Sequence, residues 1–172
     1  TLCAKGSDQF GENTMNRTFE NNDQLAESYA KVDAGFEFME KLGIEYFCFH
    51  DRDMAPEMST LKESEEALDK VSDYVLEKMN QTGIKCLWGT ANCFNNRRYL
   101  AGAGTSPNAN AFAYAAAQIK KAMDITKKLN GENYVFWGGR EGYDTLLNTD
   151  LKLELDNYAR LLYNEFETAF SS

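Results

Sequence analysis

Residues 43–53, with the sequence GIEYFCFHDRD, decide the fold of this chain. Gly43 follows a helical pattern, and the mostly apolar run 44–49 begins directly after it. The run then ends abruptly in the polar cluster His50-Asp51-Arg52-Asp53. A short apolar run without polar alternation is typical of a strand that is covered on both faces, as in a parallel sheet.

The same order of glycine and apolar run returns twice, as IKCLW at 84–88 and NYVFW at 133–137. Between the runs, apolar residues recur at steps of three and four, which predicts helices. The predicted helices span residues 24–42, 60–82, 108–130 and 149–170. Thr60 and Glu63 have the spacing of a capping box at the start of the second helix. Alternating helices and strands predict an α/β protein with a parallel sheet and right-handed crossovers.

A doubly wound sheet and a (β/α)8 barrel both fit this order of elements. No G-x-G-x-x-G motif follows a strand, which disfavours a dinucleotide-binding fold. Three clear strands, with a fourth candidate near Thr1–Lys5, cannot close a barrel that needs eight strands and about 250 residues. We therefore expect one domain over residues 1–172 whose open sheet edges are covered by self-association or by a complementing chain.

Composition sets limits on the partners of the chain. It has 172 residues, of which 43% are apolar and 26% charged, as in soluble globular proteins. A net charge of −9 argues against nucleic acid and anionic membranes as partners. No apolar run approaches the roughly 20 residues that span a membrane. The four cysteines (Cys3, Cys48, Cys86 and Cys93) match no zinc pattern, and Cys48 and Cys86 are expected to be buried free thiols. These features predict a cytoplasmic protein.

Polar and aromatic residues follow each of the three strands, at the edge where parallel α/β proteins carry their chemistry. We expect the following residues to meet there: His50, Asp53, Trp88, Thr90, Phe94, Trp137 and Glu141. Asp53 is placed to orient the imidazole of His50, the only histidine in the chain. The two indoles could wall a sugar pocket. A structural histidine and core tryptophans are the simpler alternatives, and composition alone names no reaction.

Four stretches resemble xylose isomerase of the longer, class II type. They are GSDQFGENTM at 6–15, FHDRDMAPE at 49–57, LWGTANCF at 87–94, and residues 108–157, which include VFWGGREGY and LLNTD. The resemblance implies a partial (β/α)8 TIM-type barrel, a half-barrel of three to four parallel strands and four long helices. It covers the second to fourth βα units of the catalytic barrel.

The resemblance also implies the roles of particular residues. His50 would assist opening of the sugar ring, and Asp53 would orient it. The pocket would be lined by Trp88, Thr90, Phe94, Val135 and Trp137, and Phe10 would reach from one subunit into the pocket of its neighbour. The substrate implied is a small sugar, xylose or glucose, within carbohydrate metabolism.

The complete family uses two divalent ions (Mg, Mn or Co), whose ligands lie on the fifth and later strands. This sequence has no counterparts of them, so we expect no metal bound by the chain alone and activity only with a complementing chain. The alternative is an inactive, self-associating half-barrel with residual sugar binding or a purely structural role. Met58 and Leu100-Ala101 also depart from the Gly and Val-His of the family.

Overall fold

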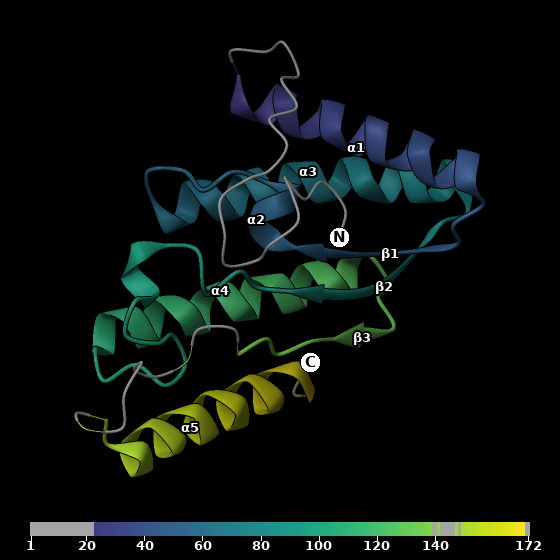
Figure 1. The fold of residues 1–172 in the computed structure, drawn as a ribbon. Coiled ribbons are helices and arrows are strands. Elements are labelled where there is room, and N and C mark those ends of the chain that lie inside the picture. The colour runs from purple at the N-terminus through teal and green to yellow at the C-terminus, as the bar shows by residue number, and fades with distance from the viewer. Residues whose placement is uncertain (1–22, 139–140, 142–146, 148, 171–172) are drawn as a thin grey trace. The chain divides into compact units, whose positions relative to one another are not determined.

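The computed structural model describes residues 23–138, 141, 147 and 149–170, without the side chains of residues 165–170. In chain order the elements are α1 (Gln24–Leu42), β1 (Tyr46–His50), α2 (Asp51–Met54), α3 (Leu61–Thr82), β2 (Lys85–Thr90), the 3-10 helix η1 (Arg97–Tyr99), α4 (Ala109–Lys128), β3 (Asn133–Tyr134) and α5 (Leu151–Phe170). The three strands form a parallel sheet in the order β1-β2-β3 (Figure 1). This confirms the predicted α/β class with four long helices, as in part of a (β/α)8 barrel. The candidate strand near Thr1–Lys5 lies outside the described residues.

The described residues divide into two compact units, which we treat separately. The first comprises residues 23–91 and 122–135, and it contains the sheet. The second comprises residues 92–121 and the described residues from 136 onward, including η1 and α5. Helix α4 passes from the second unit into the first. Of the helices in the described residues, none is long and apolar enough to cross a membrane.

In the first unit, side chains and glycines fix the ends of the helices. The Asp23 carboxylate accepts a hydrogen bond from the Leu25 amide at 3.0 Å and begins α1. Thr60 and Glu63 form the predicted capping box of α3. The helices α1 and α3 end at Gly43 and Gly83, whose φ values of 67° and 77° suit glycine because it lacks a Cβ.

The pairing of β1 with β2 contains a bulge. Phe47 pairs with Cys86, but the next residue, Cys48, pairs with Trp88, which leaves Leu87 as an extra residue in β2. Such a bulge reverses the facing of the side chains that follow it. Trp88 therefore points to the same face of the sheet as Cys48.

The bulge thus sorts the strand residues onto two faces. Phe47, Phe49 and Cys86 belong to the buried core, in contact with the helices. The alternation of side chains places His50, Trp88 and Thr90 on the opposite face.

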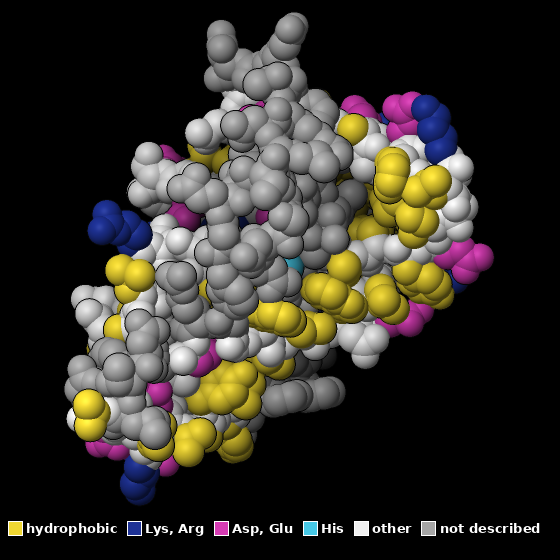
Figure 2. Space-filling view, viewed as in Figure 1, with side chains coloured by type: hydrophobic (Ala, Val, Ile, Leu, Met, Phe, Trp, Pro, Cys, Tyr) yellow, Lys and Arg dark blue, Asp and Glu magenta, His cyan; other side chains and the backbone are white. Residues whose placement is uncertain are grey.

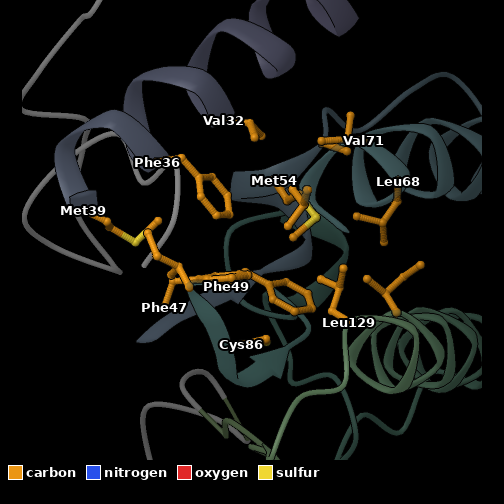
Figure 3. Close-up of a cluster of buried hydrophobic side chains, with 14 of the residues drawn as sticks. Val32, Phe36, Met39, Phe47, Phe49, Met54, Leu68, Val71, Cys86 and Leu129 are labelled. Atoms are coloured by element: carbon orange, nitrogen blue, oxygen red, sulfur yellow. The ribbon is translucent and has the colours of Figure 1, made fainter. Parts of the chain in front are cut away.

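The core of the first unit is a single apolar cluster (Figure 3). Its largest fully buried members come from α1, β1, α2, α3 and the C-terminal end of α4, with Leu129 just after it: Val32, Phe36, Phe49, Met54, Leu68, Val71, Val75, Ile125 and Leu129. Gly89 lets α4 approach the sheet, because a Cβ there would lie 2.2 Å from Thr126 Oγ1 and 2.5 Å from the Phe49 ring. A larger residue at position 89 would therefore separate the helix from the sheet.

The opposite face of the sheet is less well covered than the sequence predicts. Tyr46 and Leu87, in the first halves of β1 and β2, are 37% and 36% exposed. Figure 2 shows hydrophobic side chains gathered on the surface near the starts of these strands and the end of α1. Phe38 and Leu42 of α1, and Ile44 after it, are also exposed. The prediction of two fully covered faces is therefore wrong at the starts of these strands.

Candidate functional site

His50 is the last residue of β1, and α2 begins at the next residue. The backbone of His50 is extended, with φ −98° and ψ 143°, and the chain turns into the helix at Asp51. One turn of α2 then brings the Asp53 carboxylate back beside the imidazole, with Nδ1 and Oδ2 3.3 Å apart. The structure therefore forms the pair that the spacing of the two residues predicts.

This pair has a defined electrostatic arrangement. Because the Asp53 carboxylate lies beside Nδ1, it favours the imidazole tautomer that carries its proton on Nδ1. In that tautomer Nε2 carries the lone pair and acts as the proton acceptor. His50 is only 5% exposed, and burial strengthens the interaction by lowering the local dielectric.

Trp88 and Thr90 come from β2 and lie next to His50. The indole of Trp88 meets the imidazole edge-on, with ring centroids 6.2 Å apart and an angle of 88° between the planes. Thr90 pairs directly with His50 across the two strands. The bulge at Leu87 brings both residues to the face of His50, since without it their side chains would point into the core.

Val135 joins the same rim just after β3. Its amide donates to the Gly89 carbonyl at 3.0 Å, and its own carbonyl accepts from the Thr90 hydroxyl at 2.5 Å. The Thr90 proton thus serves the backbone, and the hydroxyl oxygen keeps its capacity to accept a hydrogen bond. The first unit brings together His50, Asp53, Trp88, Thr90 and Val135.

The other predicted pocket residues belong to the second unit or lie outside the described residues. Phe94 and Trp137 belong to the second unit, and they are 3% and 40% exposed. Phe10 lies outside the described residues. The roles of these three residues in a pocket remain predictions.

The loop that carries Phe94 is held by buried polar groups that sequence reasoning did not single out. The Asn92 side chain accepts from the amides of Phe94 and Asn95, at 3.4 and 3.1 Å. Gln118 of α4 donates to the Asn92 carbonyl at 3.1 Å and accepts from the Tyr99 hydroxyl at 2.7 Å. An asparagine at a strand end is a signal for such a turn, but its distant partner Gln118 leaves no local pattern.

Asp51 is a second residue that the sequence reasoning left without a role. It is 1% exposed, and its carboxylate accepts from the Arg52 amide at 2.8 Å. Its other oxygen lies 3.6 Å from Arg52 Nε. The Asp51 side chain thus bonds the first turn of α2, which carries Asp53.

The sequence predicts that Glu141 lies with His50 at the ends of the strands. In the structure Glu141 belongs to the second unit, and its carboxylate accepts hydrogen bonds from the loop at 103–105. Its Oε2 accepts from the amides of Ala103 and Thr105, at 3.1 and 3.2 Å, and from the Thr105 hydroxyl at 2.8 Å. Burial, together with the nearby charge of Glu141, raises the pKa of Tyr158. These contacts make Glu141 an anchor for the loop at 103–105.

In the part of the chain that the structure describes, no three His, Cys, Asp or Glu side chains lie together in a way that could hold a metal ion. These residues therefore do not fit a divalent metal site, and we derive no metal-assisted step from them. Cys48 and Cys86 are free thiols. Burial raises the pKa of Cys86 to about 12, so its thiol stays protonated at neutral pH.

Fold and site define the class of this protein: part of a parallel (β/α)8-type barrel with a histidine–carboxylate pair at the end of a strand. No protein-family model matches the sequence. The chain is 56% identical over 170 residues to a xylose isomerase of Thermotoga petrophila, covering 98% of this chain and 38% of that protein.

Two other curated xylose isomerases match the chain with similar identity. A xylose isomerase of Caldicellulosiruptor bescii is 55% identical over 170 residues, covering 98% of this chain and 39% of its own. One of Tetragenococcus halophilus is 54% identical over 160 residues, covering 93% and 37%. The chain resembles xylose isomerase over nearly its whole length, and it spans about two fifths of the length of these curated relatives.

Proposed function

We propose that this chain is the sugar-recognising part of a xylose isomerase, an intramolecular isomerase that interconverts D-xylose and D-xylulose. The observation that carries this proposal is the His50–Asp53 pair at the end of β1, with Nδ1 and Oδ2 3.3 Å apart. The identity of 54–57% to curated xylose isomerases supports it. Because the chain spans about two fifths of those proteins, catalysis requires residues from another chain or segment.

The residues of this chain would act on ring opening. A cyclic aldose opens when its anomeric hydroxyl loses a proton, the bond from C1 to the ring oxygen breaks, and the ring oxygen gains a proton. His50 Nε2 is the group that accepts or relays that proton. Asp53 stabilises the imidazole tautomer in which Nε2 is an acceptor. The indole of Trp88 offers a flat wall to the apolar face of the sugar.

In the complete family, divalent ions (Mg, Mn or Co) supply the chemistry of the hydride shift between C1 and C2. The described residues do not form such a site, so the ligands for these ions would come from outside them. The resemblance implies that Phe94, Trp137 and, from a neighbouring subunit, Phe10 would also line the sugar pocket.

A second candidate is an inactive half-barrel that self-associates. The exposed apolar side chains of Tyr46 and Leu87 on the sheet favour it, because an uncovered sheet face promotes association. Under this alternative the His50–Asp53 pair has a structural role only.

Complementation separates the two candidates. The chain is mixed with the remaining segment of the Caldicellulosiruptor bescii relative in Mg²⁺ or Mn²⁺, and xylulose formation from xylose is measured. We expect turnover from the mixture, and a loss of about 10²-fold or more in His50→Asn, the scale of a lost acid–base group. Lys62→Ala is the matched control, because its side chain is 86% exposed on α3.

A titration of the chain alone tests recognition apart from turnover. Xylitol is added while tryptophan fluorescence is followed, and a saturable change is expected from Trp88 beside His50. If the mixture shows turnover that His50→Asn does not reduce, the proposed role of His50 is wrong. No fluorescence response together with no turnover would favour the self-associating half-barrel.

A further inference from the structure

We propose that Glu141 is the positioning residue for Trp137, holding the backbone beside the indole through a loop that lies far away in the sequence. This inference rests on the proposed function only in treating Trp137 as a wall of the sugar pocket. The evidence lies entirely within the second unit, in residues 103–106, 137–138, 141 and 157–158.

The Glu141 carboxylate is a strong anchor. One of its oxygens, Oε2, accepts from the amides of Ala103 and Thr105 and from the Thr105 hydroxyl, at 2.8 to 3.2 Å. Hydrogen bonds to a charged acceptor are roughly twice as strong as neutral ones. Three of them converging on one oxygen fix the position of the Glu141 side chain relative to the loop.

Gly138 connects this anchor to the indole. It directly follows Trp137, and a Cβ on it would lie 3.3 Å from Glu141 Cγ and 3.9 Å from the Tyr158 hydroxyl. The stem of Glu141 therefore packs against the backbone next to Trp137. The Trp137 side chain is 40% exposed, so its own packing constrains it less than a buried indole would be constrained.

Helix α5 holds the loop from a second side. Asn157 Nδ2 donates to the Ser106 carbonyl at 3.2 Å. The Tyr158 ring lies against Gly104, where a Cβ would come within 3.1 Å of Cδ2. The loop is thus a fixed support, and Glu141 transmits its position to the segment of Trp137.

The experiment uses ¹⁹F NMR of the full chain labelled with 5-fluorotryptophan. The chain has two tryptophans, so two lines are expected, and Trp88→Phe assigns them. In Glu141→Ala the Trp137 line should move and broaden. Glu141→Gln should give a smaller displacement, because an amide oxygen can accept the same hydrogen bonds without the charge.

Asp156→Ala is the matched control. It also removes a carboxylate from the second unit, but from the exposed pair with Lys152 on α5, and both lines should stay in place. A merely structural role would lower the urea midpoint of Glu141→Ala and leave the Trp137 line of the folded protein unmoved, which would overturn the proposal. If Glu141→Ala does not fold, Thr105→Val is used instead, because it removes only the hydroxyl that donates to Glu141. A Trp137 line that does not move in this variant also overturns the proposal.

The spectra without ligand test the positioning role of Glu141, and a xylitol titration tests the proposed function. If neither line of the parent chain responds to xylitol but the Trp137 line moves in Glu141→Ala, the proposed function fails and the positioning role stands. If both hold, Glu141→Ala should bind xylitol more weakly than the parent chain.

Discussion

The two units of this chain are held together in different ways. The first is built on a continuous apolar cluster of large side chains such as Phe36, Phe49 and Leu68. Several of the buried apolar residues of the second are small, Ala103, Ala111 and Ala115 among them. Its buried polar side chains make specific hydrogen bonds: Gln118 bonds the Asn92 carbonyl and the Tyr99 hydroxyl, and Asn157 bonds the Ser106 carbonyl.

This difference matches what each unit carries. The first presents a short, rigid constellation at the end of β1, where His50 and Asp53 are one helical turn apart. The second carries Phe94 and Trp137 on irregular segments, which need specific hydrogen bonds to hold one conformation. Apolar packing thus supports the paired residues, and polar anchoring supports the aromatic ones.

The largest effect should come from the apolar core. Phe49→Ala removes a ring that is 0% exposed, and it should lower the free energy of unfolding by about 3–5 kcal/mol in urea titrations followed by circular dichroism. Phe38→Ala, at a position 61% exposed, should change it by about 0.5 kcal/mol or less. Equal losses in the two variants would show that this cluster does not support the first unit.

A smaller loss should follow from the polar network of the second unit. Gln118→Ala removes the acceptor of the Tyr99 hydroxyl and the donor to the Asn92 carbonyl, and it should cost about 2–3 kcal/mol. Gln81→Ala is the control, since that amide bonds Glu77 on the exposed surface of α3. If the Gln118 variant is as stable as the control, buried hydrogen bonds do not stabilise the second unit as proposed.

The capping box of α3 offers a milder test of the first unit. Thr60→Ala removes the hydroxyl that accepts from the Glu63 amide at 3.2 Å, and it should cost about 1 kcal/mol. Ser59→Ala is the neighbouring control, at an exposed position just before the cap. A cost equal to that of Phe49→Ala would mean that local helix signals and core packing contribute alike.

The smallest effect should be one of pH. Burial opposes ionisation of Asp33, but hydrogen bonds from Lys78 and Tyr74 outweigh it, so the pKa of Asp33 falls below its usual value of 3.8. The stabilisation is therefore present above that value and is lost as the pH falls through the lowered pKa. Asp33→Asn should flatten the decline in stability between about pH 4 and pH 2. An unchanged pH profile would show that this exposed pair contributes nothing, as many surface pairs do.

Most of the first unit could be predicted from the sequence. Helical periodicity and capping residues predict the observed bounds of α1, and they predict the start of α3 to within one residue of where it lies. These signals are local in the sequence. The observed β3 is only Asn133–Tyr134, shorter than the predicted run 133–137, although Val135 still bonds Gly89. After α4 the positive φ belongs to Asn130, whereas α1 and α3 end at glycines.

What could not be predicted depends on distant partners. The bulge at Leu87, which turns Trp88 and Thr90 toward His50, arises from pairing with another strand. The three donors to Glu141 lie 36 and 38 residues away, so no local pattern reveals them. The sequence therefore predicts Glu141 at the rim but gives no sign of its bonds to the loop at 103–105.

The central claim is that the His50–Asp53 pair recognises a sugar, and the single histidine of the chain allows a direct measurement. ¹⁵N-histidine labelling gives the signals of one imidazole, whose shifts report the tautomer and its contacts. We predict the Nδ1–H tautomer without ligand, and a saturable shift of Nε2 on addition of xylose or xylitol, lost in Asp53→Asn. If the ¹⁵N shifts of the imidazole do not change on addition of either sugar, both in the folded chain and in the complemented mixture, the account is contradicted.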